Sequence, residues 1–249
     1  MRPIEILESD PNLKVCLDWH GSTPSPARNI WRAQHQCVSE EFVEEEPAPT
    51  ERQAGERIVK VLLQSRGHYE PLRWAHCSFF VRGFPHDTVM QLVRHQDSAH
   101  LVQSLRSTGG RLCNLQYPLS QEELEELFYA PPPGVYRSRE GEEIEYSQEL
   151  RNADLRAYGM AAQTYCHRIS AGYPKELARR GLPFAIRQNY TISADLRAIL
   201  HLLDQRTKAD TQLEARALAE GLLQGVEEFV PEVGAFYRSN RYGRARLAP

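Results

Sequence analysis

Long segments with helical spacing alternate with a few short strand-like runs, and this alternation most constrains how the chain can fold. Ile58, Val59 and Leu62 recur at helical spacing after Glu51, and Gly67 provides a natural end for that helix. Strand-like runs are predicted at residues 14–17, 76–81 and 187–193. The pattern predicts an α+β fold, with a mixed or antiparallel sheet flanked by long helices.

Amphipathic spacing and end signals place the helices. They are predicted at residues 27–41, 51–67, 87–95, 122–129, 146–170, 174–180, 195–205 and 209–229. Gly83 and Pro85 are expected to break the strand that begins at His76, and Gly109-Gly110 to end the ambiguous segment 101–108. Since neither an internal repeat nor a break in composition is found, residues 1–249 are predicted to form a single domain with a mobile tail at 238–249.

The charge balance and hydropathy narrow the function classes. A formal net charge of -3 argues against a general nucleic-acid-binding role, although a local arginine cluster can still bind a small anion. No apolar run approaches the length of a membrane span, and the residues after Met1 lack the apolar core of a signal peptide. We therefore expect a cytoplasmic protein that binds neither nucleic acid nor a membrane.

The cysteines are scattered singly, at Cys16, Cys37, Cys77, Cys113 and Cys166. No two of them lie at a Cys-x-x-Cys spacing, so no metal site is predicted from them. We expect reduced and mostly buried thiols, none of them in a setting that would make it a nucleophile.

Two blocks in the first half of the chain concentrate residues that packing alone does not explain. Gly67-His68-Tyr69-Glu70-Pro71-Leu72 presents a histidine directly after a helix end. Further on, Gln91-Leu92-Val93-Arg94-His95-Gln96 is followed by Ser104-Leu105-Arg106, and arginine, serine and backbone amides beside a glycine turn suit a phosphate group. Taken alone, each block is more simply explained as a surface turn or a helix end.

A third block runs from Ala178 to Arg216. Arg179 precedes a Gly-Leu-Pro turn, and the helix that begins at Asp195 is expected to place Arg197, His201 and Asp204 near one polar face. The opposite face of this helix carries leucine and isoleucine and is expected to be buried. The Rossmann glycine pattern, the phosphate-binding loop and the Gly-x-Ser-x-Gly elbow are all absent from the sequence.

Taken in order, these blocks resemble the flavin-dependent thymidylate synthases over residues 28–235. Arg94-His95-Gln96, seven residues, Ser104, one residue and Arg106 match the family's signature spacing. Gly67 to Leu72 looks like its Gly-His-x-x-Pro turn, and Ala178 to Pro183 looks like its Ala-Arg-x-x-Leu-Pro. The helix from Asp195 to Arg206 and the Gln212-Leu213-Glu214 that follows it complete the resemblance.

The resemblance implies a homotetramer with composite sites, in which FAD is reduced by NADPH and methylenetetrahydrofolate donates a carbon to dUMP or a related pyrimidine nucleotide. The implied nucleotide ligands are Gln91, Ser104, Leu105, Arg106, Arg206 and, from a neighbouring chain, Arg179. Among these, Arg206 would face the uracil carbonyl and act in catalysis. The implied flavin contacts are His68, Arg94, His95, Gln96, Asp195, Arg197 and His201.

The chain departs from the family pattern at several of these positions, namely Gln96, Ala99, Val102, Ser107, Asp195 and Asp210. Losing a cation and gaining carboxylates would weaken the binding of an anionic cofactor. Three hypotheses follow: methylation of dUMP to dTMP, flavin-dependent C5 alkylation of a different pyrimidine nucleotide, and a non-catalytic relative that binds nucleotide or flavin.

Overall fold

A computed structural model describes residues 2–138 and 141–244. The chain divides into two compact units that interleave along the sequence. Unit 1 comprises Met1–Lys14, Val81–Leu92 and Leu101–Tyr190, and unit 2 comprises Val15–Phe80, Val93–His100 and Thr191–Pro249. Four of the five boundaries fall inside the strands of a four-stranded sheet, which has the order β1-β2-β6-β3, and the fifth follows residue 92. These strands are β1 (Lys14–Leu17), β2 (His76–Pro85), β3 (Ala99–Val102) and β6 (Arg187–Asp195).

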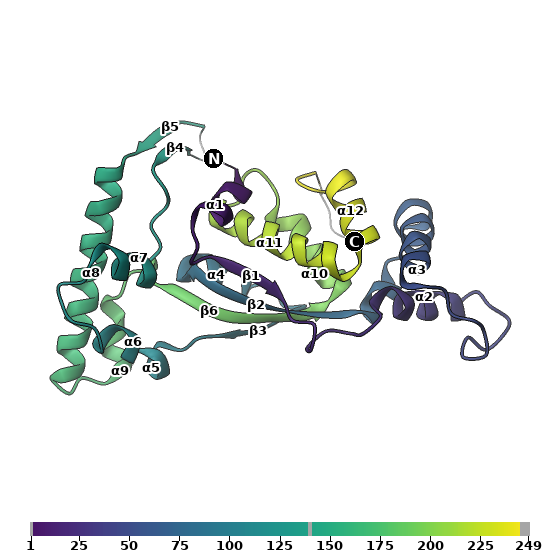
Figure 1. Ribbon diagram of the computed structural model, residues 1–249, viewed down its shortest axis with the longest axis horizontal. Helices are drawn as coiled ribbons and strands as arrows, with labels where there is room; N and C mark the ends of the chain where they lie inside the picture. The colour runs from purple at the N-terminus through teal and green to yellow at the C-terminus, as the bar shows by residue number, and fades with distance from the viewer. Residues whose placement is uncertain (1, 139–140, 245–249) are drawn as a thin grey trace. The chain divides into compact units, whose positions relative to one another are not determined.

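Unit 1 carries most of the short helices and the longest one (Figure 1). Its elements are α1 (Pro3–Ser9), α4 (His86–Leu92), α5 (Leu105–Thr108), α6 (Gly110–Cys113), α7 (Gln121–Leu127), β4 (Gly134–Arg137), β5 (Glu143–Tyr146), α8 (Gln148–Ser170), α9 (Lys175–Ala178) and the 3-10 turn η3 (Arg179–Gly181). Leu112, Phe128, Leu155 and Tyr165 belong to one buried cluster, so α6, α7 and α8 share a core.

In unit 2, α2 packs against α3 and α11 packs against α10 and α12, while α12 also contacts α3 (Figure 1). Its elements are α2 (Pro26–Gln36), α3 (Glu51–Ile58), the π-helix η1 (Val59–Arg66), the 3-10 turn η2 (Glu70–Trp74), α10 (Leu196–Arg206), α11 (Leu213–Phe229) and α12 (Pro231–Asn240). Gly67 ends η1 in the left-handed conformation with φ 58°, as the sequence predicts.

The α+β class and the long helices are confirmed, whereas several boundaries were wrong. The strand β2 continues through Gly83 to Pro85, because Gly83 adopts φ 80° and Pro85 occupies the strand's last position. The glycines after residue 108 do not end the helical region, since α6 begins at Gly110. The helix α2 ends at Gln36, and the antiparallel hairpin of β4 and β5 was not predicted.

The structure describes residues 238–244 of the tail that the sequence predicts to be mobile, and the mobility itself stays a prediction. The helix α12 continues to Asn240, and Arg238 pairs with Glu220 at 2.7 Å. Arg241 reaches Asp204 of α10, with its Nη2 2.5 Å from the carboxylate. Asp204, expected on a polar face, is therefore buried in an ion pair, with only 1% of its side chain exposed. Residues 245–249 of the expected tail lie outside the described residues.

The cysteine prediction is also wrong for two residues. Cys113 of α6 and Cys166 of α8 form a disulfide, although 53 residues separate them in the sequence. Both belong to or pack against the core that α6 shares with α8, and sequence spacing alone does not reveal that proximity. Cys77 is a buried free thiol, and burial raises its pKa.

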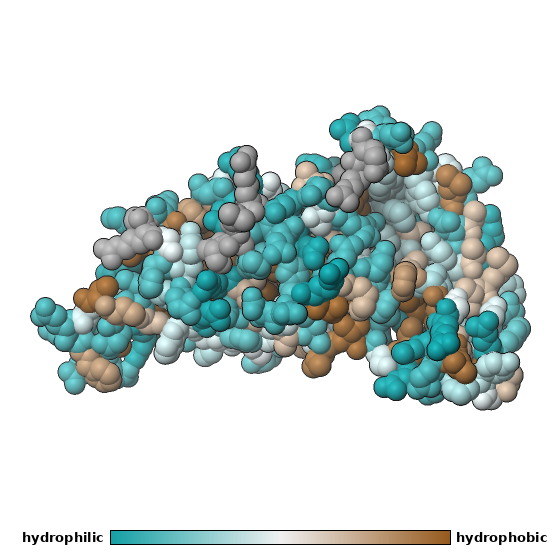
Figure 2. All heavy atoms as spheres, turned by 180° about the vertical axis from the view of Figure 1, so that it is seen from behind, coloured by the Kyte–Doolittle hydropathy of each residue, from teal (hydrophilic) through white to brown (hydrophobic). Residues whose placement is uncertain are grey.

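Some large apolar side chains remain exposed, among them Met160 at 65% and Phe184 at 70%. Figure 2 shows hydrophobic residues lying among hydrophilic ones on the face seen from behind. Exposed apolar surface of this kind is a common feature of contacts between subunits, but the homotetramer stays a prediction. Among the described residues, no helix combines the length and hydropathy of a membrane span.

Candidate functional site

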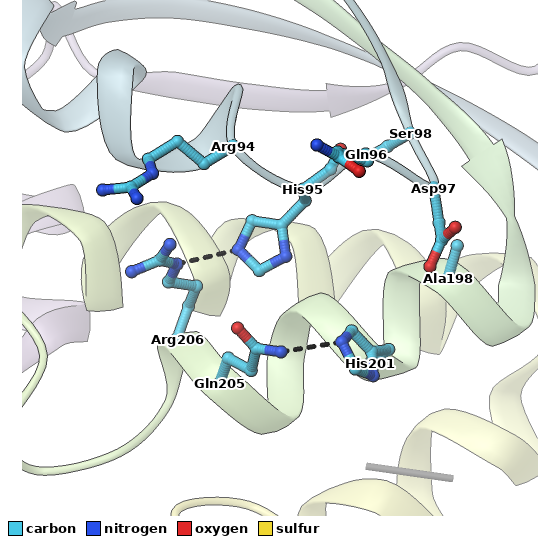
Figure 3. A pocket seen from close by; sticks show the side chains of 9 residues that line it. All are labelled: Arg94, His95, Gln96, Asp97, Ser98, Ala198, His201, Gln205 and Arg206. Carbon is cyan, nitrogen blue, oxygen red and sulfur yellow. Dashed lines mark hydrogen bonds between the residues drawn. The ribbon is translucent and has the colours of Figure 1, made fainter.

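A pocket of about 390 Å³ in unit 2 collects the residues of two separate sequence blocks. It is lined by Arg94, His95, Gln96, Asp97, Ser98, Ala198, His201, Gln205 and Arg206 (Figure 3). The first five belong to the loop between α4 and β3, and the other four belong to α10. The volume lies in the range of small-molecule sites.

The helix α10 presents its pocket residues because its other face is buried. Leu196, Ile199 and Leu203 are fully buried, as the leucine and isoleucine pattern predicted. Residues three and four apart lie on the same side of a helix, so His201 and Gln205 project together toward the pocket (Figure 3). Asp195 begins the helix by accepting a hydrogen bond from the backbone N–H of Ala198 at 2.8 Å.

His95 and Arg206 form the central contact of the pocket. The guanidinium Nε–H of Arg206 donates to Nε2 of His95 at 2.9 Å (Figure 3). An arginine only donates, so Nε2 of His95 carries the lone pair and the ring proton lies on Nδ1. Burial, and then the charge of Arg206, lower the pKa of His95 to about 4. The ring is therefore neutral near pH 7 and offers Nδ1–H as a donor.

The second histidine of the pocket is held in a similar way. The side-chain amide nitrogen of Gln205 lies 2.7 Å from Nε2 of His201 (Figure 3). With that amide as donor, the ring proton of His201 also lies on Nδ1. Close by, the hydroxyl of Ser98 donates to the backbone oxygen of His95 at 2.9 Å, which fixes the loop that carries His95.

Positive charge exceeds negative charge in this pocket. Burial, and then the nearby charge of Arg94, lower the pKa of Arg206. Asp97 is the carboxylate among the lining residues, and its charge acts to raise the pKa of His95. Arg206 is half-buried and Arg94 is exposed, and an anionic or electron-rich ligand would relieve the repulsion between them. The pocket thus suits a ligand of that kind.

The remaining predicted flavin residues of unit 2 do not line this pocket. Arg197 pairs with Glu70, which also lies 3.3 Å from Arg73. Besides capping α10, Asp195 lies 3.8 Å from Arg73. His68 is exposed in the turn after Gly67. The structure therefore gives Asp195 and Arg197 local structural contacts, and their contact with a cofactor stays a prediction.

In unit 1, Ser104 and Arg106 lie at the start of α5. The hydroxyl of Ser104 accepts a hydrogen bond from the backbone N–H of Arg106 at 3.3 Å and caps the helix. The guanidinium of Arg106 lies 3.3 Å from the carboxylate of Glu176, and Lys175 donates to the backbone oxygen of Arg106 at 2.8 Å. The start of α9 thus holds Arg106 in place.

Arg179 lies near the same carboxylate. The pKa of Glu176 is lowered, first by a backbone hydrogen bond and then by Arg106, with a further contribution from Arg179. Arg106 and Arg179, both predicted phosphate ligands, therefore lie close to the carboxylate of Glu176 in the same chain. That a neighbouring chain supplies Arg179 to the site stays a prediction. Gln91 is half-buried on α4, and Leu105 packs against the core of unit 1.

Sequence reasoning missed several residues around these predicted ones. Asp97 and Ser98 follow directly on the signature residues, and Gln205 lies four residues after His201. That helical spacing was a signal that would have found Gln205. Lys175 and Glu176 precede Arg179 closely, but nothing in the sequence shows that they contact Arg106.

The fold therefore carries a pocket lined by arginine and histidine side chains, whose charge suits an anionic ligand. Residues 20–232 match the family model described as Thymidylate synthase complementing protein. The chain therefore belongs to this family, as its sequence motifs predicted.

Similar proteins with curated names are flavin-dependent thymidylate synthases. That of Halobacterium salinarum is 29% identical over 203 residues, which cover 78% of this chain and 81% of the relative. That of Haloarcula marismortui is 28% identical over 197 residues, covering 75% of this chain and 77% of the relative.

Two solved structures share the fold. The UMP/dUMP methylase PolB from Streptomyces cacaoi, bound with 5-Br dUMP, superposes with a TM-score of 0.71 at 22% identity, covering 95% of this chain and 97% of its own. Thymidylate Synthase X from Helicobacter pylori, with FAD and dUMP, gives a TM-score of 0.67 at 17% identity, covering 89% of this chain and 98% of its own.

Proposed function

We propose that this protein methylates C5 of dUMP to give dTMP, using FAD, methylenetetrahydrofolate and NADPH. The observation that carries the proposal is the pocket in which His95 holds Arg206 beside Arg94 and His201. Family membership supports the reaction class, and curated relatives are named flavin-dependent thymidylate synthases.

The residues present fit a flavin despite the departures from the family pattern. Arg94 and Arg206 lie close enough for one to lower the pKa of the other, so an electron-rich group between them is favourable. The Nδ1–H groups of His95 and His201 add neutral donors. Gln96 lines the same pocket and contributes a carboxamide where the family has a third cation. Arg94, His95, Gln96 and His201 would hold FAD, with Arg197, Asp195 and His68 as more peripheral contacts.

Bound FAD would supply the reducing equivalents that convert the transferred one-carbon unit into a methyl group. The chain itself would provide binding, orientation and charge. Reaction at C5 of uracil places negative charge on the ring carbonyls, and a fixed cation stabilises that charge. We assign this role to Arg206, because its Nε is held by His95 and its guanidinium lines the pocket.

Binding of the nucleotide phosphate is assigned to Ser104, Leu105, Arg106 and Arg179, with Gln91 as a further nucleotide contact. Arginine forks match the geometry of a phosphate dianion. Arg106 forms an ion pair with Glu176, whose carboxylate would compete with a phosphate. Since Arg106 and Glu176 are both well exposed, their ion pair is weak enough for a phosphate to compete with it.

Methylation of UMP or of another pyrimidine nucleotide is the second candidate. Val102 occupies the position at which the family usually has an acid next to the nucleotide. One protein that shares the fold is named a UMP/dUMP methylase, which makes UMP the first alternative substrate to assay.

Mass spectrometry of nucleotide products tests the proposal. The protein is incubated anaerobically with FAD, NADPH, methylenetetrahydrofolate and either dUMP or UMP, and each component is omitted in turn. We expect dTMP that requires every component. Methylated UMP without dTMP would favour the second candidate. Absence of both products from folded, FAD-bound protein would contradict methylation of dUMP and of UMP, and would leave another pyrimidine nucleotide or a non-catalytic relative.

A further inference from the structure

A second pocket, of about 230 Å³, lies wholly within unit 1 and is not used by the proposed reaction. It is formed around the strand residues Arg82, Gly83 and Asn189 and the helix residue Arg111. Gln103 and the buried Arg187 also line it. The polar groups that this pocket offers to a ligand are mainly hydrogen-bond donors.

Two carboxamide side chains have their oxygens already engaged by the backbone. The N–H of Gly83 donates to Oδ1 of Asn189 at 3.3 Å, and the N–H of Asn189 donates to Oε1 of Gln103 at 3.4 Å. Each contact fixes which end of the amide is the oxygen. The NH2 groups of Asn189 and Gln103 are therefore the ends that remain to serve a ligand, and both are donors.

Arg111 adds a partly buried cation. Its Nη2 donates to the backbone oxygen of Arg187 at 2.6 Å, and its Nε is sealed from solvent with no hydrogen-bond partner among the described residues. Burial lowers the pKa of Arg111, and no carboxylate among the described residues raises it. A cation that has lost water without gaining a counter-charge is stabilised by an anion.

The other charged residues of this pocket do not cancel the positive charge of Arg111. Arg187 is satisfied, because it pairs with Asp10 at 2.6 Å and donates to the backbone oxygens of Gly83 and Glu125. Arg82 is exposed at the pocket and has no ion pair within the described part of the chain. Glu126 is an exposed carboxylate that also lines the pocket, so solvent screens its charge.

We propose that this pocket binds a small oxyanion, a phosphate or a carboxylate, between Arg111, Arg82 and the NH2 groups of Asn189 and Gln103. The site is distinct from the residues assigned to the nucleotide phosphate and does not depend on the proposed reaction. Phosphate and carboxylate share the negatively charged oxygens that such donors recognise.

Isothermal titration calorimetry of the full chain tests this site. The Arg106→Gln/Arg206→Gln double variant serves as the background, so that neither the predicted nucleotide phosphate site nor the pocket around His95 contributes. Inorganic phosphate and glutarate are the two probes. We expect saturable binding of at least one of them at a single site, and the probe that binds more tightly identifies the natural class of oxyanion.

Asn189→Asp is the decisive variant. An aspartate keeps the acceptor for the N–H of Gly83 but replaces the NH2 donor by a repelling oxygen. Binding should weaken by at least about tenfold, with the melting temperature little changed. Arg82→Gln alters an exposed side chain and should weaken binding a few-fold, so the test survives if Asn189→Asp fails to fold. Glu126→Gln should strengthen binding. No heat with either probe, or binding that Asn189→Asp and Arg82→Gln both leave unchanged, overturns the proposal.

Discussion

Replacing His95 by leucine removes the acceptor that holds Arg206. The two nitrogen atoms are 2.9 Å apart, and the guanidinium is partly buried, so the change leaves a desolvated donor on a charged group. Hydrogen bonds to charged groups contribute about 1.5–3 kcal/mol, which corresponds to about a 10- to 150-fold loss if the contact matters fully in the reacting complex. We expect kcat for methylation to fall in that range.

His95→Gln is the matched control, since a glutamine oxygen can accept from Arg206 at the position of Nε2. The steady-state kinetics and the FAD dissociation constant are measured for both variants. We expect glutamine to retain much more activity than leucine, with both folded. Equal losses in the two variants would refute the role of His95 in holding Arg206 and would assign its effect to direct contact with the cofactor.

The pH dependence gives a second check on the same pair. Folding lowers the pKa of His95 from about 6.5 to about 4, so the folded state favours the neutral ring. The stability that this contributes is fully present above about pH 6.5 and is lost as the pH falls toward 4. Urea unfolding of the parent protein should therefore lose more stability over that window than unfolding of His95→Gln. Parallel stability profiles for the two proteins would contradict this assignment.

Two further substitutions test contacts outside the pocket. Arg241→Leu should lower the free energy of unfolding by about 3–5 kcal/mol, because it leaves the carboxylate of Asp204, which is only 1% exposed, without its partner. As a control, Arg52→Leu removes an exposed ion pair and should lower it by less than about 1 kcal/mol. Similar losses for the two variants in urea unfolding would argue against a buried ion pair. Glu176→Gln should tighten dUMP binding by at most about fivefold in calorimetry, because it removes an exposed competitor for Arg106. Weaker binding would mean that Glu176 positions Arg106 instead.

The sequence predicted the elements that depend on local pattern. The buried face of α10 follows from leucine and isoleucine at helical spacing, and the end of η1 follows from Gly67. Arg94, His95 and Gln96 of the signature line one pocket with His201 and Arg206 of the third block, whereas Ser104 and Arg106 lie in unit 1. The family resemblance grouped these residues, and their binding roles stay predictions.

Features that depend on distant partners were not predictable in this way. The sequence places Asp204 on a helix, but it does not indicate that the ion-pair partner is Arg241, 37 residues later. Cys113 and Cys166 are linked only through the packing of α6 against α8. Gly83 was expected to break a strand, since the sequence does not show that a residue with φ 80° can be accommodated inside it.

The most direct test of the account is the fate of dUMP that carries deuterium at C5, analysed by mass spectrometry after anaerobic turnover. We expect dTMP that has lost the deuterium, formed only with FAD, NADPH and methylenetetrahydrofolate present. We also expect the rate to fall about a hundredfold or more for Arg206→Met, since a single stabilising donor is worth that much. Recovery of dUMP with its deuterium intact from folded, FAD-bound protein would contradict the account.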